Sequence, residues 1–155
     1  MSSGPQVGDI APDFELESTE GPIRLSERLT RGPVLLAFYP GDDTPVCTKQ
    51  LCDYRDNLSV FSDLGVQVIA LNPQSSSSHE SFSKKHGLPF PLISDPERQA
   101  CGAYGAVGLL GMTRRSLYLI GRDGRVKYRR TDLPIFRRSA IELERVIMGS
   151  DLGGS

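Results

Sequence analysis

Two cysteines five residues apart, Cys47 and Cys52, are the residues of this sequence best suited to carry out chemistry. The 155-residue chain has one further cysteine, Cys101, and so small and odd a number cannot build a disulfide framework. In a reducing compartment stable structural disulfides are rare, and those that form tend to be transient and catalytic. We therefore interpret the cysteines as reactive groups or as small core residues.

Cys47 falls where a buried strand is predicted to pass into a helix. The continuous apolar run 34–39 is typical of a strand covered on both faces. Beyond it, Thr44 is a good N-cap and Pro45 stands at the favoured first helical position. Unpaired backbone N–H groups and the positive end of the helix dipole favour thiolate over thiol in this first turn. The alternative is a small core residue, but the strand end, the cap and the second cysteine favour function.

The predicted helix, which runs to about residue 64, points the two cysteines in different directions. At about 100° per residue, four apolar residues fall within roughly 40° of Cys47 and define an inward stripe. They are Leu51, Tyr54, Leu58 and Phe61. Cys52 is turned about 140° away, with the two Cα atoms about 8–9 Å apart, beyond the ~7 Å limit for a disulfide. A Cys47–Cys52 bond would therefore require the first turns to unwind, which suggests a redox cycle gated by local unfolding.

A positive side chain beside the sulfur would stabilise a thiolate further. Arg114 and Arg115 directly precede a later predicted strand, and we interpret Arg114 as a solvated loop charge. The pattern Pro40-x-x-x-Thr44-x-x-Cys47 follows a buried strand and is accompanied by this arginine. In that context it is similar to the peroxiredoxin signature.

The resemblance covers about residues 6–148 and is specific to the bacterioferritin-comigratory-protein or peroxiredoxin Q branch. Three features carry it: Ala-Pro-Asp-Phe at 11–14, the spacing of Cys47 and Cys52, and Arg-Ser-Leu-Tyr-Leu-Ile at 115–120. The resemblance implies an α/β protein with a thioredoxin-like fold, in which a mixed central sheet is flanked by helices and preceded by an N-terminal β-hairpin. It also implies a thiol peroxidase.

The resemblance assigns roles by position. It makes Cys47 the peroxidatic cysteine and Cys52 the resolving cysteine, joined to it by an intramolecular disulfide during the cycle. The Thr44 hydroxyl would hydrogen-bond the thiolate and the peroxide, and Arg115 would stabilise the thiolate and polarise the O–O bond. Pro40 would shield the sulfur from water and over-oxidation. The implied substrates are hydrogen peroxide and organic hydroperoxides, and the implied reductant is thioredoxin or a similar dithiol, with no metal or organic cofactor.

Two positions depart from the family pattern. The usual glycine before the cysteine is Val46, and a glutamate common three residues after it is Gln50, which keeps a hydrogen-bonding amide but loses charge. Both changes can alter the rate or the ease of unwinding. Cys101 matches no resolving position, so we interpret it as a core or partly exposed helix residue. His79 and His86 lie on a polar helix and are interpreted as surface residues.

The rest of the chain must supply the elements that position this site. The order strand, helix, strand, helix, strand, helix, hairpin and helix predicts a mixed sheet with helices on both sides. The predicted strands are 34–39, 66–71, 91–94, 116–120 and 126–130, after a hairpin within 10–25. The predicted helices after the one at Cys47 are 79–86, 95 to about 105, and about 136–148. We expect a single domain over residues 1–155.

Composition excludes several classes of partner. The chain has 18 Lys+Arg and 19 Asp+Glu, for a net charge of -1, so nothing favours a nucleic-acid or anionic-membrane partner. No apolar run approaches the ~20 residues of a membrane span. The first residues lack the positive start and apolar stretch of a signal peptide. If the chain is complete, we expect a cytoplasmic protein, and the resemblance favours a monomer.

Other functions remain open. A non-catalytic thioredoxin-fold binding or chaperone module would be favoured if Cys47 reacted only slowly with peroxide. A metal site made of Cys47, Cys52 and the histidines is disfavoured, because a Cys-x4-Cys spacing on one helix points the sulfurs apart. A cysteine phosphatase would need an arginine six positions after the cysteine, where this chain has Asp53.

Overall fold

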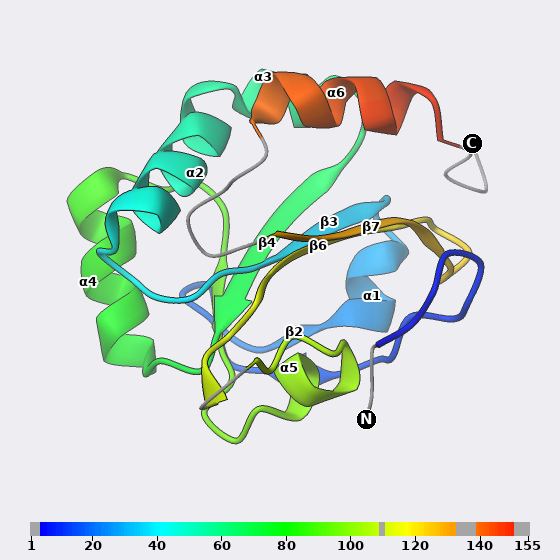
Figure 1. Ribbon diagram of the computed structural model, residues 1–155. Coiled ribbons are helices and arrows are strands. Elements are labelled where there is room, and N and C mark those ends of the chain that lie inside the picture. Colours follow the sequence, from blue (N-terminus) through cyan, green and yellow to red (C-terminus); the bar gives the residue numbers. More distant parts are fainter. Residues whose placement is uncertain (1–3, 109–110, 133–138, 151–155) are drawn as a thin grey trace.

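A five-stranded mixed sheet forms the centre of the molecule (Figure 1). The structure is a computed structural model, and it describes residues 4–108, 111–132 and 139–150. The strand order is β5-β4-β3-β6-β7, with β3, β4 and β5 parallel and with β6 and β7 added antiparallel. The strands are β3 (Val34–Phe38), β4 (Gln67–Asn72), β5 (Leu92–Ser94), β6 (Arg115–Ile120) and β7 (Val126–Asp132). The predicted mixed sheet, with its antiparallel edge strand, is confirmed.

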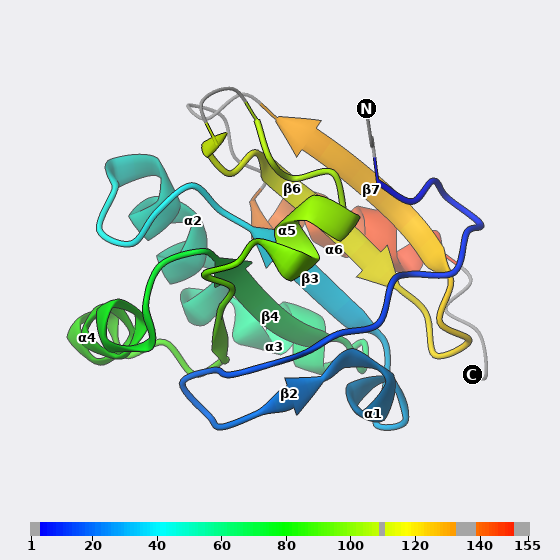
Figure 2. The same cartoon turned by 90° about the horizontal axis from the view of Figure 1, so that it is seen from below.

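Helices cover both faces of this sheet, and a small antiparallel hairpin lies on one of them (Figure 2). The hairpin consists of β1 (Glu15–Leu16) and β2 (Ile23–Arg24). The helices are α1 (Leu25–Leu29), α2 (Pro45–Asp56), α3 (Leu58–Ser62), α4 (Ser76–His86), α5 (Gln99–Ala103) and α6 (Ala140–Met148). In the part of the chain that the structure describes, no helix is both long and apolar enough to span a membrane.

The core is divided into two apolar clusters by the central strand. Side chains alternate in direction along a strand, so neighbouring residues of β3 face opposite sides of the sheet. Leu35, Ala37 and Tyr39 belong to the cluster beneath α2, α3, α4 and α6. The residues between them belong to the cluster beneath α1, α5 and the N-terminal hairpin. Because β3 is covered on both faces, its entire length is buried, as its continuous apolar run predicts.

The prediction of one helix from residue 45 to residue 64 is wrong beyond Asp56. Here α2 ends, and α3 follows after Asn57, whose φ and ψ angles are -118° and 30°. The Asn57 side-chain amide donates to the carbonyl and carboxylate oxygens of Asp53, at 2.9 and 3.0 Å. Such local side-chain bonds compete with the helical backbone pattern and account for the break.

Two other helices start at residues that differ from the prediction. Helix α4 begins at Ser76, three residues earlier than predicted, since the Ser75 hydroxyl accepts the backbone N–H of Ser78 at 3.2 Å. Helix α5 begins at Gln99, later than predicted, because Arg98 before it has a left-handed φ of 56°, which no α-helix accommodates. The Gln99 backbone N–H donates to Asp95 Oδ1 at 2.8 Å. The predicted start of the last helix near residue 136 lies outside the described residues.

Candidate active site

Cys47 lies in the first turn of α2, beyond the carboxyl end of the central strand β3 (Figure 1). Thr44 is the N-cap residue, with extended φ and ψ angles of -80° and 146°, and Pro45 is the first helical residue. The Cys47 side chain is fully buried and packs in the same apolar cluster as Leu51 and Tyr54. The prediction that the sulfur lies on the inward stripe of this helix is therefore confirmed.

A buried guanidinium contacts the sulfur. Arg115 is 2% exposed, and its Nη2 donates to Cys47 Sγ at 3.0 Å. Arg115 is the first residue of β6, which runs antiparallel to β3 with Phe38 opposite Ser116. This register brings the start of β6 to the edge where β3 ends. A fixed positive charge and a hydrogen-bond donor therefore lie directly against the sulfur.

Gln50 completes the site from the next turn of α2. It is fully buried, and its Oε1 accepts a hydrogen bond from Arg115 Nη1. Its Nε2 donates to the Tyr54 hydroxyl at 3.0 Å. The amide therefore orients the guanidinium that contacts Cys47. Gln50 makes this contact with an uncharged amide, at the position where the family pattern commonly has a glutamate.

Thr44 and Pro40 lie at the same edge of the sheet. In this structure the Thr44 hydroxyl donates to the Gly41 carbonyl oxygen at 3.0 Å, so its proton is already engaged. Donation to a peroxide would require this hydroxyl to rotate. Pro40 lines a cavity of about 490 Å³. The other lining residues are Pro73, Gln74, Arg98, Gly111, Met112 and Thr113.

The three cysteines are free thiols in this structure. Cys52 is partly exposed on α2, and the helical turns between it and Cys47 are intact. Cys101 is fully buried in α5, as predicted for a core residue. Burial and the neighbouring Asp95 carboxylate raise the pKa of the Cys101 thiol far above its usual value. This thiol therefore stays protonated and is a poor nucleophile.

The interpretation of His79 as a surface residue is wrong. Its side chain is fully buried, with Nδ1 at 2.8 Å from Asp42 Oδ2 and Nε2 at 2.9 Å from the Ile93 carbonyl oxygen. The serine- and lysine-rich composition of α4 gave no sign of this, because the partner Asp42 stands 37 residues earlier in the chain. His86 is partly buried, with a side chain 20% exposed.

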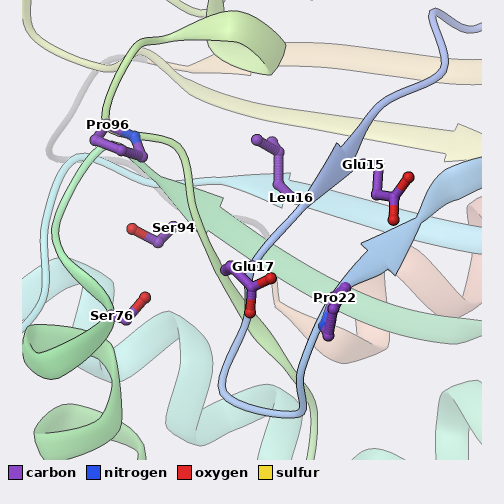
Figure 3. Close-up of a pocket in the computed structure, with 7 residues that line it drawn as sticks. All are labelled: Glu15, Leu16, Glu17, Pro22, Ser76, Ser94 and Pro96. Carbon is purple, nitrogen blue, oxygen red and sulfur yellow. The ribbon is translucent and has the colours of Figure 1, made fainter.

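Another cavity, of about 500 Å³, lies between the N-terminal hairpin and the end of β5 (Figure 3). Its lining residues are Glu15, Leu16, Glu17, Pro22, Ser76, Ser94 and Pro96. None of the predicted site residues is among them, and two carboxylates would repel a thiolate or a peroxide anion. Within the described ranges, no group of three or more His, Cys, Asp or Glu residues is arranged to hold a metal ion.

A buried cysteine at a helix start, with an arginine donor on its sulfur, defines a thiol-based redox site on a mixed α/β sheet. The AhpC/TSA family model matches residues 7–129 of this chain. A putative peroxiredoxin, bcp, of Coxiella burnetii is 42% identical over 102 residues, covering 66% of this chain and 68% of that protein. A putative peroxiredoxin of Mycobacterium tuberculosis is 39% identical over 127 residues, covering 77% and 80%. The chain therefore belongs to the AhpC/TSA family, that of the peroxiredoxins.

Structural similarity agrees with this assignment. The crystal structure of peroxidoxin BcpB from Mycobacterium tuberculosis superposes with a TM-score of 0.82 at 29% identity, over 93% of this chain and 95% of that chain. The thioredoxin-like fold and the resemblance to the bacterioferritin-comigratory-protein and peroxiredoxin Q branch are confirmed. Family membership makes the protein a peroxiredoxin-type thiol peroxidase.

Proposed function

We propose that the protein is a thioredoxin-dependent, atypical 2-Cys peroxiredoxin that reduces hydrogen peroxide and organic hydroperoxides. The observation that carries this proposal is the 3.0 Å contact between Arg115 Nη2 and the buried Cys47 sulfur at the start of α2. The contact supports Cys47 as the peroxidatic residue because it joins a nucleophile to a fixed positive charge. That charge can also stabilise the negative charge that develops on the leaving oxygen as the O–O bond breaks.

In the first step the Cys47 thiolate attacks the terminal oxygen of the hydroperoxide. A sulfur–oxygen bond forms, the O–O bond breaks, and the alkoxide or hydroxide leaves and takes up a proton. The sulfur loses two electrons and becomes a sulfenic acid. Arg115 stabilises the developing charge, and Thr44 donates to the peroxide after its hydroxyl turns away from the Gly41 carbonyl oxygen. Pro40 limits the access of water to the sulfur.

In the second step Cys52 resolves the sulfenic acid. The first turns of α2 unwind, and the Cys52 thiolate attacks the Cys47 sulfur. The Cys47–Cys52 disulfide forms and the hydroxyl group leaves, taking up a proton to become water. The positions of the two cysteines on one intact helix support this requirement for unwinding. The partly exposed Cys52 is also the sulfur that a partner protein would reach.

A dithiol protein then restores both cysteines by thiol–disulfide exchange and is itself oxidised to a disulfide. Thioredoxin is the reductant that the family resemblance supports. The same resemblance supports a monomeric enzyme that needs no cofactor. The nearly balanced charge favours neither a nucleic-acid nor an anionic-membrane partner, and a cytoplasmic location is the expectation for a complete chain. These statements, together with a single domain over residues 1–155, remain predictions.

Three single substitutions test the proposal. Cys47→Ser should abolish thioredoxin-driven peroxide consumption, because it removes the sulfur that Arg115 Nη2 contacts. Cys52→Ser should consume about one equivalent of peroxide and then stop, since the sulfenic acid has no resolving thiol. Cys101→Ser is the matched control and should turn over like the wild type. Full steady-state activity of Cys47→Ser would refute the proposal, whereas slow oxidation of Cys47 by peroxide in the wild type would favour a non-catalytic binding module.

A further inference from the structure

The segment between β3 and α2 is fixed by the side chain of Asp42, which is 3% exposed. Its Oδ1 accepts a hydrogen bond from the Tyr39 hydroxyl at 2.6 Å. Its Oδ2 accepts the Ser78 hydroxyl at 2.7 Å and contacts His79 Nδ1 at 2.8 Å. The Asp42 backbone N–H donates to Gln74 Oε1 at 2.5 Å. Both oxygens of a buried carboxylate are thereby satisfied, which offsets the cost of burying it.

His79 ties this carboxylate to the scaffold. Its Nε2 faces the carbonyl oxygen of Ile93 in β5, which can only accept, so Nε2 carries a proton. The contact between His79 Nδ1 and Asp42 Oδ2 then also holds one proton, as an imidazolium–carboxylate pair or as its neutral equivalent. Burial raises the pKa of Asp42, but the hydrogen bonds from His79, Ser78 and Tyr39 outweigh it and hold the pKa below its usual value.

The chain after this anchor has few attachments. Residues 43–45 are exposed, and residue 46 is only partly buried. Asp43 pairs with Lys85 at 3.1 Å, but both side chains are more than half exposed, and such surface pairs contribute little. The first buried residue of α2 is Cys47. The turn that carries the reactive sulfur is therefore held at one end by Asp42 and at the other by the packing of Cys47 and its contact with Arg115. Between them, the Thr44 hydroxyl bonds to the Gly41 carbonyl oxygen.

We propose that Asp42 and His79 are positioning residues that keep the Cys47 turn helical, with its sulfur beside Arg115. They thereby determine how much of a newly formed Cys47 sulfenic acid is oxidised further to sulfinic acid and how much forms the disulfide with Cys52. While the turn stays folded, a second hydroperoxide can oxidise the sulfenic acid to sulfinic acid and release an alcohol or water. Once the turn unwinds, Cys52 forms the disulfide instead. This inference rests on the proposed peroxidase cycle and adds to it the residues that control its second step.

Substitutions at Asp42 should act in a graded way. Asp42→Asn can still accept from Tyr39 and can donate to a neutral His79, so neutral bonds replace charge-assisted ones. Asp42→Ala loses every side-chain bond. We expect the ratio of disulfide to sulfinic acid to rise from wild type to Asn to Ala, by roughly 10- to 100-fold in total, the scale set by hydrogen bonds to a charged group.

Tyr39→Phe gives the sharpest test, because it removes one donor to Asp42 without leaving a cavity. Tyr118→Phe is its matched control. Each substitution removes one buried phenol hydroxyl that makes a 2.6 Å hydrogen bond, to Asp42 in one case and to the Tyr104 carbonyl oxygen in the other. The two tyrosines belong to apolar clusters on opposite faces of the sheet. A general loss of stability would therefore affect both variants alike.

The experiment treats each reduced protein with excess hydrogen peroxide, quenches it at intervals with acid and quantifies Cys47 products by mass spectrometry. Thermal melts are recorded in parallel. Tyr39→Phe should raise the disulfide-to-sulfinic ratio by about 3- to 10-fold, while Tyr118→Phe should keep the wild-type ratio. Equal ratios in all three proteins, or equal changes in the two variants, would overturn the inference. A wild type that forms neither product would instead overturn the proposed function.

Discussion

The contact of Arg115 with Cys47 predicts how fast the protein reacts with peroxide when this arginine is replaced. Replacing it with methionine removes the donor at 3.0 Å from Cys47 Sγ and also the one that Gln50 accepts. A hydrogen bond to a charged group contributes about 1.5–3 kcal/mol, and each 1.36 kcal/mol is a factor of ten. If the transition state gains this stabilisation relative to the reduced resting site, the rate constant for peroxide should fall roughly 10- to 150-fold.

The same substitution should also reduce stability. The side-chain oxygen of Gln50, Oε1, would lose the hydrogen bond that Arg115 donates to it, and this residue is fully buried. A buried polar group without a partner costs about 1–3 kcal/mol, so rates must be measured well below the melting temperature of the variant. Arg115→Lys should fall between wild type and methionine. A single ammonium lacks the planar fork that reaches Cys47 and Gln50 together.

The assay must follow the sulfur chemically, because the chain contains no tryptophan whose fluorescence could report the reaction. Rapid mixing with peroxide, a quench with a sulfenic-acid trap and mass spectrometry give the second-order rate constant. Arg114→Met is the matched control, since this neighbouring arginine is exposed. It should react like the wild type. If Arg115→Met reacts within about twofold of Arg114→Met, the guanidinium has no part in activating the sulfur.

Two further predictions follow from groups away from the sulfur. Because burial and Asp95 raise the pKa of Cys101, iodoacetamide at neutral pH should label Cys52 in the folded protein and leave Cys101 unlabelled. Rapid labelling of Cys101 would contradict this. The pKa of Asp42 is lower in the folded than in the unfolded chain, so its stabilisation is complete above the unfolded pKa and is lost as pH falls through the folded value. The melting temperature of the wild type should therefore decrease as the pH is lowered below about 4, and that of Asp42→Asn should decrease less. Identical dependence of the two melting temperatures on acid pH would refute the assignment.

Local sequence signals predicted the position of Cys47 in the fold correctly. The apolar run 34–39 and Pro45 act within a few residues, so they place Cys47 in a first helical turn without any tertiary information. Thr44 occupies the predicted N-cap position, but its hydroxyl bonds to the Gly41 carbonyl oxygen and makes no cap hydrogen bond. The break at Asn57 was missed for the opposite reason. Apolar spacing continues through it, while the interruption comes from one side-chain amide that bonds to Asp53.

Contacts between segments far apart in the chain could be predicted from the sequence only in part. Arg115 lies 68 residues from Cys47 in the chain, and its contact depends on the antiparallel register of β3 and β6. Only the family resemblance selected it over Arg114. His79 carried no comparable signal, because burial of a histidine on a polar helix depends on a carboxylate 37 residues away. The orienting role of Gln50 likewise needed the position of Arg115, although its place on the helix was known.

The central claim is that Cys47 is the sulfur that peroxide oxidises and that Cys52 is the one that resolves it. Reduced wild-type protein treated with one equivalent of hydrogen peroxide, then alkylated and digested, tests it in a single peptide map. We predict a Cys47–Cys52 disulfide as the main product, with Cys101 recovered as a thiol. Oxidation located mainly at Cys52 or Cys101, with Cys47 recovered unmodified, would contradict the account.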